Sequence, residues 1–235
     1  MPQILPDRWR NTANRWLQAC LPHSCLLCGS ASRNALCPQC FDDLPRLLSA
    51  CPQCAEPTPA GECCGRCLAH PRHFDGVQAP FIYAFPLDRL IHAYKYGGEL
   101  VLAPWFARQL AEKLVLADCT TIFPMPLHPH RLCERGFNQS AELAILLGKM
   151  LKHPVDLETL QRRRATPPQA ALPHKERVAN VRGAFECVRS LSGERILLID
   201  DVMTTGATAD ECARTLKLHG AATVSIAVVA RAVKL

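Results

Sequence analysis

Residues 195–208 read Arg-Ile-Leu-Leu-Ile-Asp-Asp-Val-Met-Thr-Thr-Gly-Ala-Thr. The branched apolar residues at 196–199 predict a buried central strand, because strands covered on both faces are apolar throughout. Asp200 and Asp201 stand at the carboxyl end of this strand, where open α/β sheets bind ligands. Two adjacent carboxylates after a strand also occur in solvated turns, so the loop that follows decides between the two interpretations.

This loop is rich in small and hydroxyl-bearing residues, and it leads into a predicted helix at 209–219. Thr208 and Glu211 have the spacing of a capping box, which places the helix start at Thr208. The free backbone N–H groups of a helix start attract anions, and Gly206 lets a ligand approach the backbone closely. The loop is therefore predicted to bind a phosphate monoester, with the threonine hydroxyls as further donors.

Strand-like and helix-like apolar patterns alternate along most of the remaining chain. This alternation predicts an α/β domain whose parallel sheet is covered by helices on both faces. The predicted strands are 77–85, 121–124, 195–199 and 223–230, and the predicted helices are 88–96, 103–117, 137–150 and 209–219.

The composition is that of a folded protein. Of 235 residues, 49% are hydrophobic and 20% charged, and 27 basic against 21 acidic side chains leave a net charge of +6. Disordered, collagen-like and acidic-tail proteins are excluded, and one or two domains are expected. No apolar run reaches the roughly 18 residues of a membrane helix. Because residues 1–21 also lack the apolar core of a secretory signal, we expect a cytoplasmic protein.

Cysteine is concentrated near the N-terminus, where ten of the 14 cysteines precede Ala69. Eight of them form four C-x-x-C pairs, and two such pairs complete the four-thiolate shell of structural zinc. Sequential pairing is the simplest arrangement, although interleaved pairing satisfies the same spacing. A disulfide framework or a redox dithiol does not account for four pairs, and an iron–sulfur cluster uses this ribbon spacing less often. The predicted zinc ligands are Cys25, Cys28, Cys37, Cys40, Cys51, Cys54, Cys64 and Cys67.

The stretch at 195–208 resembles the ribose-5-phosphate signature of type I phosphoribosyltransferases, which bind phosphoribosyl pyrophosphate (PRPP). The resemblance implies that the two aspartates face the ribose hydroxyls, directly or through waters on Mg²⁺, and that residues 204–208 hold the 5-phosphate. The PRPP-binding residues implied here are Asp200, Asp201, Val202, Met203, Thr204, Thr205, Gly206, Ala207 and Thr208.

More of the chain is similar to the ComF family of competence-associated proteins, in which cysteine knuckles precede a phosphoribosyltransferase-like domain. The matching segments are His92–Gly97, Pro124–Arg131, Arg135–Gln139, Thr166–Gln169, Leu172, Arg177, Asn180 and Ala184–Phe185. We accordingly expect an N-terminal helical segment at 1–24, a double zinc-ribbon domain at 25–70, and a parallel-sheet type I phosphoribosyltransferase fold at 77–235.

Lys95, Arg131 and Arg135 are the candidates for binding pyrophosphate. Residues 124–131 lie between a predicted strand and a predicted helix, so they open at the same sheet edge as Asp200. Departure of pyrophosphate leaves an oxocarbenium-like ribose, and cations must stabilise the charge of the leaving group. We expect Arg131 and the two aspartates to be catalytic. For Lys95 or Arg131 alone, a solvated surface charge is the alternative.

The basic loop at 161–168 contains Arg162, Arg163 and Arg164. Phosphoribosyltransferases have a mobile hood over the site at about this point, so the resemblance implies a hood that excludes water during transfer. A solvated loop and a contact to nucleic-acid phosphates are the alternatives. The hood is slightly favoured over DNA, because no aromatic residue between 161 and 184 is available to stack bases.

Two functions follow from these observations. The first is an Mg²⁺-dependent phosphoribosyltransferase that transfers ribose 5-phosphate from PRPP to an unidentified acceptor. The second is a non-enzymatic competence component that binds single-stranded DNA, a DNA-uptake protein or a helicase. Family resemblance implies the handling of incoming DNA in both cases.

Overall fold

The computed structural model describes residues 24–115, 119–164 and 181–233. Contacts within the chain divide it into two units, residues 1–44 and residues 45–235. Each unit is described by itself. Residues 165–180, which include the expected matches at Thr166–Gln169, Leu172, Arg177 and Asn180, lie outside the described residues, as does nearly all of the expected helical segment at 1–24.

The described part of the first unit contains a turn around Cys25 and Cys28, which is followed by the short helix α2 (Pro38–Asp42). Gly29 adopts a left-handed backbone conformation with φ of 76°, and its N–H donates to the Cys25 carbonyl at 2.9 Å. This turn brings the Cys25 and Cys28 side chains to the same side. Cys37 stands at the N-cap of α2, so the helix start positions the second pair of thiols.

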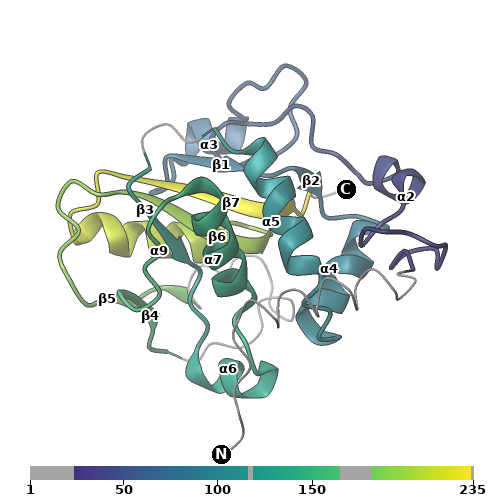
Figure 1. Ribbon diagram of the computed structural model, residues 1–235. Helices are drawn as coiled ribbons and strands as arrows, with labels where there is room; N and C mark the ends of the chain where they lie inside the picture. The colour runs from purple at the N-terminus through teal and green to yellow at the C-terminus, as the bar shows by residue number, and fades with distance from the viewer. Residues whose placement is uncertain (1–23, 116–118, 165–180, 234–235) are drawn as a thin grey trace, which may run out of the picture. The chain divides into compact units, whose positions relative to one another are not determined.

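A parallel sheet forms the centre of the larger unit (Figure 1). Its strands lie in the order β1-β7-β6-β3, and β2 also pairs with β7. All of these pairings are parallel, as the sequence predicts. The strands are β1 (Gly76–Gln78), β2 (Phe81–Ile82), β3 (Thr121–Pro124), β6 (Arg195–Met203) and β7 (Thr223–Arg231).

Helices pack on both faces of this sheet. Along β6, side chains alternate between the faces, and Ile196 and Leu198 share a buried cluster with Cys212 and Leu216 of α9. Leu197 therefore points to the opposite face, on which α5 and α7 pack against each other. The helices of the unit are α3 (Gly65–Ala69), α4 (Leu87–Tyr96), α5 (Leu102–Lys113), α6 (Pro129–Arg135), α7 (Gln139–Leu151) and α9 (Ala207–Leu218).

A separate antiparallel pair, β4 (Leu160–Arg162) and β5 (Phe185–Cys187), precedes β6 in the chain. The basic residues of the expected hood begin on β4. The described residues therefore place the base of this segment, while its middle at 165–180 is not described.

Two local expectations are wrong. The strand expected at 77–85 is divided into β1 and β2, because Pro80 lacks the N–H needed to continue a ladder. The capping box is also absent: α9 begins at Ala207, and its N-cap is Gly206 with φ of 79°. Instead of returning to a cap, the Glu211 carboxylate accepts a hydrogen bond from the Gly183 N–H at 2.7 Å. It also pairs with Arg214 at 2.7 Å.

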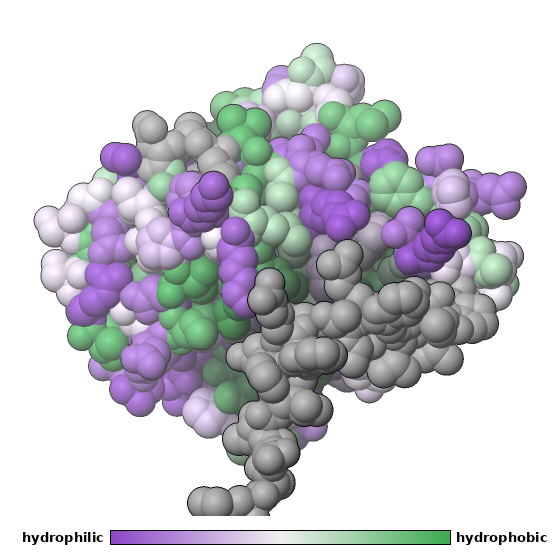
Figure 2. All heavy atoms as spheres, in the orientation of Figure 1, coloured by the Kyte–Doolittle hydropathy of each residue, from purple (hydrophilic) through white to green (hydrophobic). Residues whose placement is uncertain are grey.

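Hydrophilic residues are interspersed with hydrophobic ones over the face drawn in Figure 2. Within residues 24–115, 119–164 and 181–233, no helix has both the length and the apolar character needed to cross a membrane.

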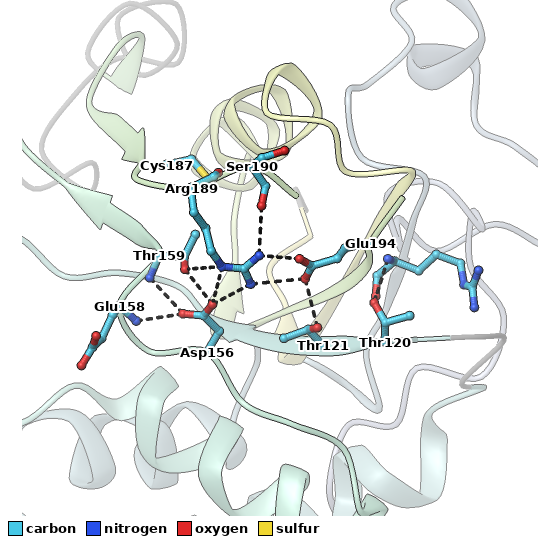
Figure 3. A network of polar contacts seen from close by, with 10 residues as sticks. Thr120, Thr121, Asp156, Glu158, Thr159, Cys187, Arg189, Ser190 and Glu194 are labelled. Carbon is cyan, nitrogen blue, oxygen red and sulfur yellow. Dashed lines mark hydrogen bonds and ion pairs between the residues drawn. The ribbon is translucent and has the colours of Figure 1, made fainter. Parts of the chain in front are cut away.

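A polar network ties the chain before β4 to the turn before β6 (Figure 3). The Arg189 guanidinium donates to Asp156 at 2.9 Å and also pairs with Glu194. Asp156 further accepts a hydrogen bond from the Thr159 hydroxyl at 2.7 Å. Burial alone would raise the pKa of Asp156, but these hydrogen bonds lower it to about 2.

We expect Asp156→Asn to lower the free energy of unfolding at pH 7 by about 1–2 kcal/mol, because the depressed pKa reflects native interactions of the carboxylate. Since the native pKa lies below the ordinary value of 3.8, this stabilisation is present above that value and is lost as the pH falls toward about 2. Urea denaturation at several pH values measures the difference. Glu158→Gln, at an exposed carboxylate nearby, is the control. A difference that stays constant between pH 7 and pH 2 would contradict the assignment.

Candidate functional site

The two aspartates at the end of β6 are held by side chains from other elements. The Lys95 ammonium of α4 lies 2.9 Å from Asp201 Oδ1. The Ser140 hydroxyl, in the first turn of α7, donates to Asp200 Oδ1 at 3.0 Å. Asp200 Oδ1 also accepts the Asp201 N–H at 2.9 Å. The predicted pair therefore sits where α4, α7 and the central strand meet.

Burial and neighbouring charges both act on this carboxylate pair. Burial and then the charge of Asp201 raise the pKa of Asp200 to about 7, while Lys95 opposes the shift. Asp201 is only 3% exposed, and among the described residues its Oδ2 atom has no hydrogen-bond partner. A buried acceptor without a donor calls for a cation, a hydroxyl or water. Carboxylate oxygens are ligands that Mg²⁺ prefers, so these residues fit that ion.

The loop between β6 and α9 forms a small cup. Gly206 makes the turn with its positive φ, and the Ala207 N–H donates to the Thr205 hydroxyl at 3.3 Å. The first turn of the 12-residue helix leaves N–H groups without partners inside the helix. A cavity of about 80 Å³ opens here, lined by Asp200, Val202, Met203, Thr204, Gly206, Ala207, Thr208, Ala209, Ile226 and Val228.

A larger cavity of about 670 Å³ adjoins the aspartates. It brings together the predicted residues Lys95, Arg131, Arg135, Asp200, Asp201 and Thr208. The other lining residues include Tyr96, Met125, His128, Gln139, Ser140 and Arg162. The polar edge of the sheet is thus a single hollow that contains both the carboxylates and the predicted cations.

The predicted arginines are already engaged by neighbours. Arg131, which is 42% exposed at its side chain, lies 3.2 Å from Glu134 on α6. Arg135 donates to the Gln139 side-chain oxygen at 2.6 Å and its guanidinium lies 4.9 Å from the centre of the Tyr96 ring. A phosphate ligand would have to compete for Arg131, whereas the contacts of Arg135 hold its guanidinium at the cavity wall.

Sequence reasoning missed Ser140. A serine in the first turn of a helix is most simply explained by the helix start, and Asn138 in fact supplies that cap by accepting from the Ser140 N–H at 3.0 Å. The cap frees the Ser140 hydroxyl for Asp200. Ser140 and Asp200 are 60 residues apart in the sequence, so the contact becomes visible only in the folded chain.

The eight predicted cysteines form two groups with sequential pairing. Cys25, Cys28, Cys37 and Cys40 make one group, and Cys51, Cys54, Cys64 and Cys67 make the other. Within each group the thiol sulfurs lie within 4.8 Å of one another. The interleaved alternative is thereby excluded for the described residues.

The geometry of both groups suits zinc. Cys28 Sγ and Cys37 Sγ are 3.8 Å apart, and Cys54 Sγ and Cys64 Sγ are 3.6 Å apart. A tetrahedron with Zn–S bonds of about 2.3 Å has sulfurs about 3.8 Å apart. Burial would raise the pKa of Cys51, but nearby backbone groups lower it to about 6, which favours the thiolate that binds metal. Four sulfur donors in each group therefore fit one structural Zn²⁺.

Two protein-family models match this chain, one over the cysteine-rich segment and one over the part that contains the two aspartates. Residues 16–68 match the double zinc ribbon domain, and residues 141–234 match the phosphoribosyl transferase domain. The second match contains the two aspartates, the loop at 204–208 and the strands β6 and β7.

Several characterised proteins are similar over most of the chain. DNA utilization protein YhgH of Salmonella typhi is 34% identical over 219 residues, which cover 88% of this chain and 96% of that protein. Competence protein F of Haemophilus influenzae is 30% identical over 216 residues, covering 86% and 92% respectively. Among solved structures, the glutamine PRPP amidotransferase of B. subtilis has a TM-score of 0.41 and 19% identity, covering 58% of this chain and 30% of that one.

Proposed function

We propose, since this chain belongs to the ComF family that includes competence protein F and DNA utilization protein YhgH, that it binds PRPP with Mg²⁺ and transfers ribose 5-phosphate during the handling of incoming DNA. One observation carries the proposal. A carboxylate pair, in which the buried Asp201 has an oxygen without a partner among the described residues, stands between a small cup and a cavity lined by cations. We expect this chemistry to take place in the cytoplasm.

The chain's own residues suit the two ends of PRPP. The loop at 204–208 offers backbone N–H groups and threonine hydroxyls to the 5-phosphate. Asp200 and Asp201 would orient the ribose hydroxyls. Mg²⁺, when bound beside these carboxylates, would neutralise charge on the pyrophosphate.

The reaction requires the bond between ribose C1 and the pyrophosphate oxygen to break while a bond from C1 to the acceptor forms. The acceptor atom supplies the electron pair of the new bond and releases its proton to solvent, and the leaving pyrophosphate keeps the electron pair of the broken bond. Arg131 and Arg135 lie on the cavity wall where they could offset this charge, and arginine pairs bidentately with phosphate oxygens. Lys95 holds Asp201 in place at 2.9 Å before substrate enters.

Release of pyrophosphate from PRPP tests the proposal. We expect Mg²⁺-dependent release in the presence of an acceptor from a panel of bases, nucleosides, nucleotides and single-stranded DNA. Isothermal calorimetry with PRPP and Mg²⁺ should show binding even without an acceptor. Absence of both signals would reject the enzymatic function.

A non-enzymatic role in binding single-stranded DNA is the second candidate, and it is favoured by the arginines of the β4 segment. Arg163 is 61% exposed at its side chain, and it pairs with Glu186 at 2.5 Å. Arg164 donates to the Arg182 carbonyl at 2.7 Å. Arg162 differs from both, because it lines the cavity that contains Asp200. The segment therefore presents basic groups to two different environments.

Separate substitutions distinguish the two functions. We expect Arg162→Ala to reduce pyrophosphate release at least about tenfold without changing DNA affinity, because this side chain lines the ligand cavity. If the segment contacts DNA, Arg163→Ala with Arg164→Ala should weaken single-strand binding and reduce its salt slope by roughly 0.7 for each lost contact. Fluorescence anisotropy at several salt concentrations measures the second effect.

The charge-matched control is Arg89→Ala with Arg108→Ala, which removes two exposed arginines from α4 and α5. A DNA affinity that falls equally in this control would show only an effect of net charge. Unchanged turnover in Arg162→Ala would remove that residue from the proposed site.

A further inference from the structure

Arg231, the last residue of β7, is a buried link between the second cysteine group and the phosphate loop. Its exposed fraction is 2%, which is rare for arginine unless every donor is satisfied. Its Nε donates to the Cys54 carbonyl at 2.8 Å, and Nη2 pairs with Glu56 at 2.7 Å. On the other side, Nη1 donates to the Met203 carbonyl at 3.1 Å and also to the Thr204 carbonyl.

These contacts join two sites that the sequence separates widely. Cys54 belongs to the second zinc-type group, and Thr204 is the first residue of the loop proposed to hold phosphate. A guanidinium has five donors in a fixed plane, so its bonds to Cys54 and Thr204 constrain the two backbones together. The position of the first residue of the phosphate loop therefore depends on the geometry of the second cysteine group.

A second set of contacts supports the same link independently. The His73 N–H, which follows the cysteine-rich segment, donates to the Asp210 carboxylate in the first turn of α9 at 2.7 Å. The Phe74 ring packs so near Gly206 that a Cβ there would lie 3.8 Å from it. Within the first C-x-x-C pair of the second cysteine group, the Pro52 carbonyl accepts the Val77 N–H of β1 at 3.1 Å. The second cysteine group is thus hydrogen-bonded to the sheet, and the residues that follow it, His73 and Phe74, contact α9 and the phosphate loop.

We propose that Arg231 is a positioning residue that makes the phosphate loop depend on metal at the second cysteine group, Cys51, Cys54, Cys64 and Cys67. The first group, Cys25 to Cys40, belongs to the other unit of the chain and has no such role. The inference rests on the proposed function only for the identity of the ligand, because the link itself is a property of the backbone.

The test is made on the full chain with two readouts. In Arg231→Met, the Thr204 carbonyl loses the Arg231 donor, while the Met203 carbonyl retains the Ala232 N–H at 2.9 Å, so we expect amide hydrogen exchange at 204–208 to become at least about tenfold faster. Exchange in β3 and α7 should stay within about twofold of the native protein. Calorimetry with PRPP and Mg²⁺ should show an affinity at least about tenfold weaker.

Arg189→Met is the matched control, because Arg189 is also held by several hydrogen bonds but contacts no residue of the phosphate loop in the described contacts (Figure 3). Arg231→Lys keeps the charge but not the planar fork, and should give a smaller change in the same direction. It decides the question if Arg231→Met does not fold. Loop exchange that rises no more in either Arg231 variant than in Arg189→Met would overturn the proposal.

Loss of metal provides the second arm. Cys54→Ser should accelerate exchange at 204–208, whereas Cys28→Ser, in the first group, should leave it unchanged. Equal acceleration in both variants, or in neither, would overturn the link. A native protein that binds no PRPP would reject the proposed function, while the exchange measurements would still test the role of Arg231.

Discussion

Replacing Asp200 and Asp201 together with asparagine is expected to weaken Mg²⁺-dependent binding of PRPP by at least about 100-fold, or about 2.7 kcal/mol. The substitution removes the negative charge from Asp200 and from Asp201, whose Oδ2 has no hydrogen-bond partner in the described part of the chain. It keeps an oxygen that can accept from Ser140 and from Lys95, so the surrounding contacts are preserved. Calorimetry with and without Mg²⁺ measures the loss, and thermal denaturation should show a melting temperature within a few degrees of the native value.

The matched control removes two carboxylates elsewhere. Glu112→Gln with Glu158→Gln changes the net charge by the same amount, at exposed positions on α5 and before β4. PRPP affinity in this control should stay within about twofold of the native value. If the double asparagine variant binds equally well, the ribose and Mg²⁺ assignments of the two aspartates fall, although the cup at 204–208 could still bind phosphate.

The parts of the site that were predictable are those in which neighbours in sequence are neighbours in space. An apolar strand followed at once by two carboxylates and a small-residue loop identifies the sheet edge, since the geometry of strand, loop and helix is local. The same holds for the four C-x-x-C pairs, whose spacing fixes the direction of two sulfurs. The capping box failed although it is local, because the Gly183 backbone and Arg214 compete for the Glu211 carboxylate.

The remainder depends on long-range contacts. Ser140 reaches Asp200 across 60 positions, and Arg231 reaches Cys54 across 177. In the sequence, Arg231 follows an apolar strand, and a charged residue at such a position is most simply expected to be exposed to solvent. Its burial is possible because acceptors from two distant segments, 54–56 and 203–204, converge on it, and no pattern within β7 encodes that convergence.

The two cysteine groups are expected to differ in what their metal stabilises. We expect close to two zinc ions per chain, one for each Cys₄ group. Cys28→Ser should lose about one ion and loosen only the N-terminal unit. Cys51→Ser should lose the other ion and lower the melting temperature of the larger unit by more than about 10 °C, because structural zinc contributes roughly 10–16 kcal/mol in small zinc domains and this group lies inside that unit.

Metal analysis and calorimetric melting of the three proteins measure this difference. Each variant removes one sulfur from the first C-x-x-C pair of its group, so each serves as the control for the other. A protein that contains iron with visible absorbance, or no metal, would contradict both assignments. If Cys28→Ser destabilised the larger unit as strongly as Cys51→Ser, zinc would act on the chain as a whole. The hydrogen bonds from Val77 to Pro52 and from Arg231 to Cys54 predict the opposite, since they connect the second cysteine group to the sheet of its own unit.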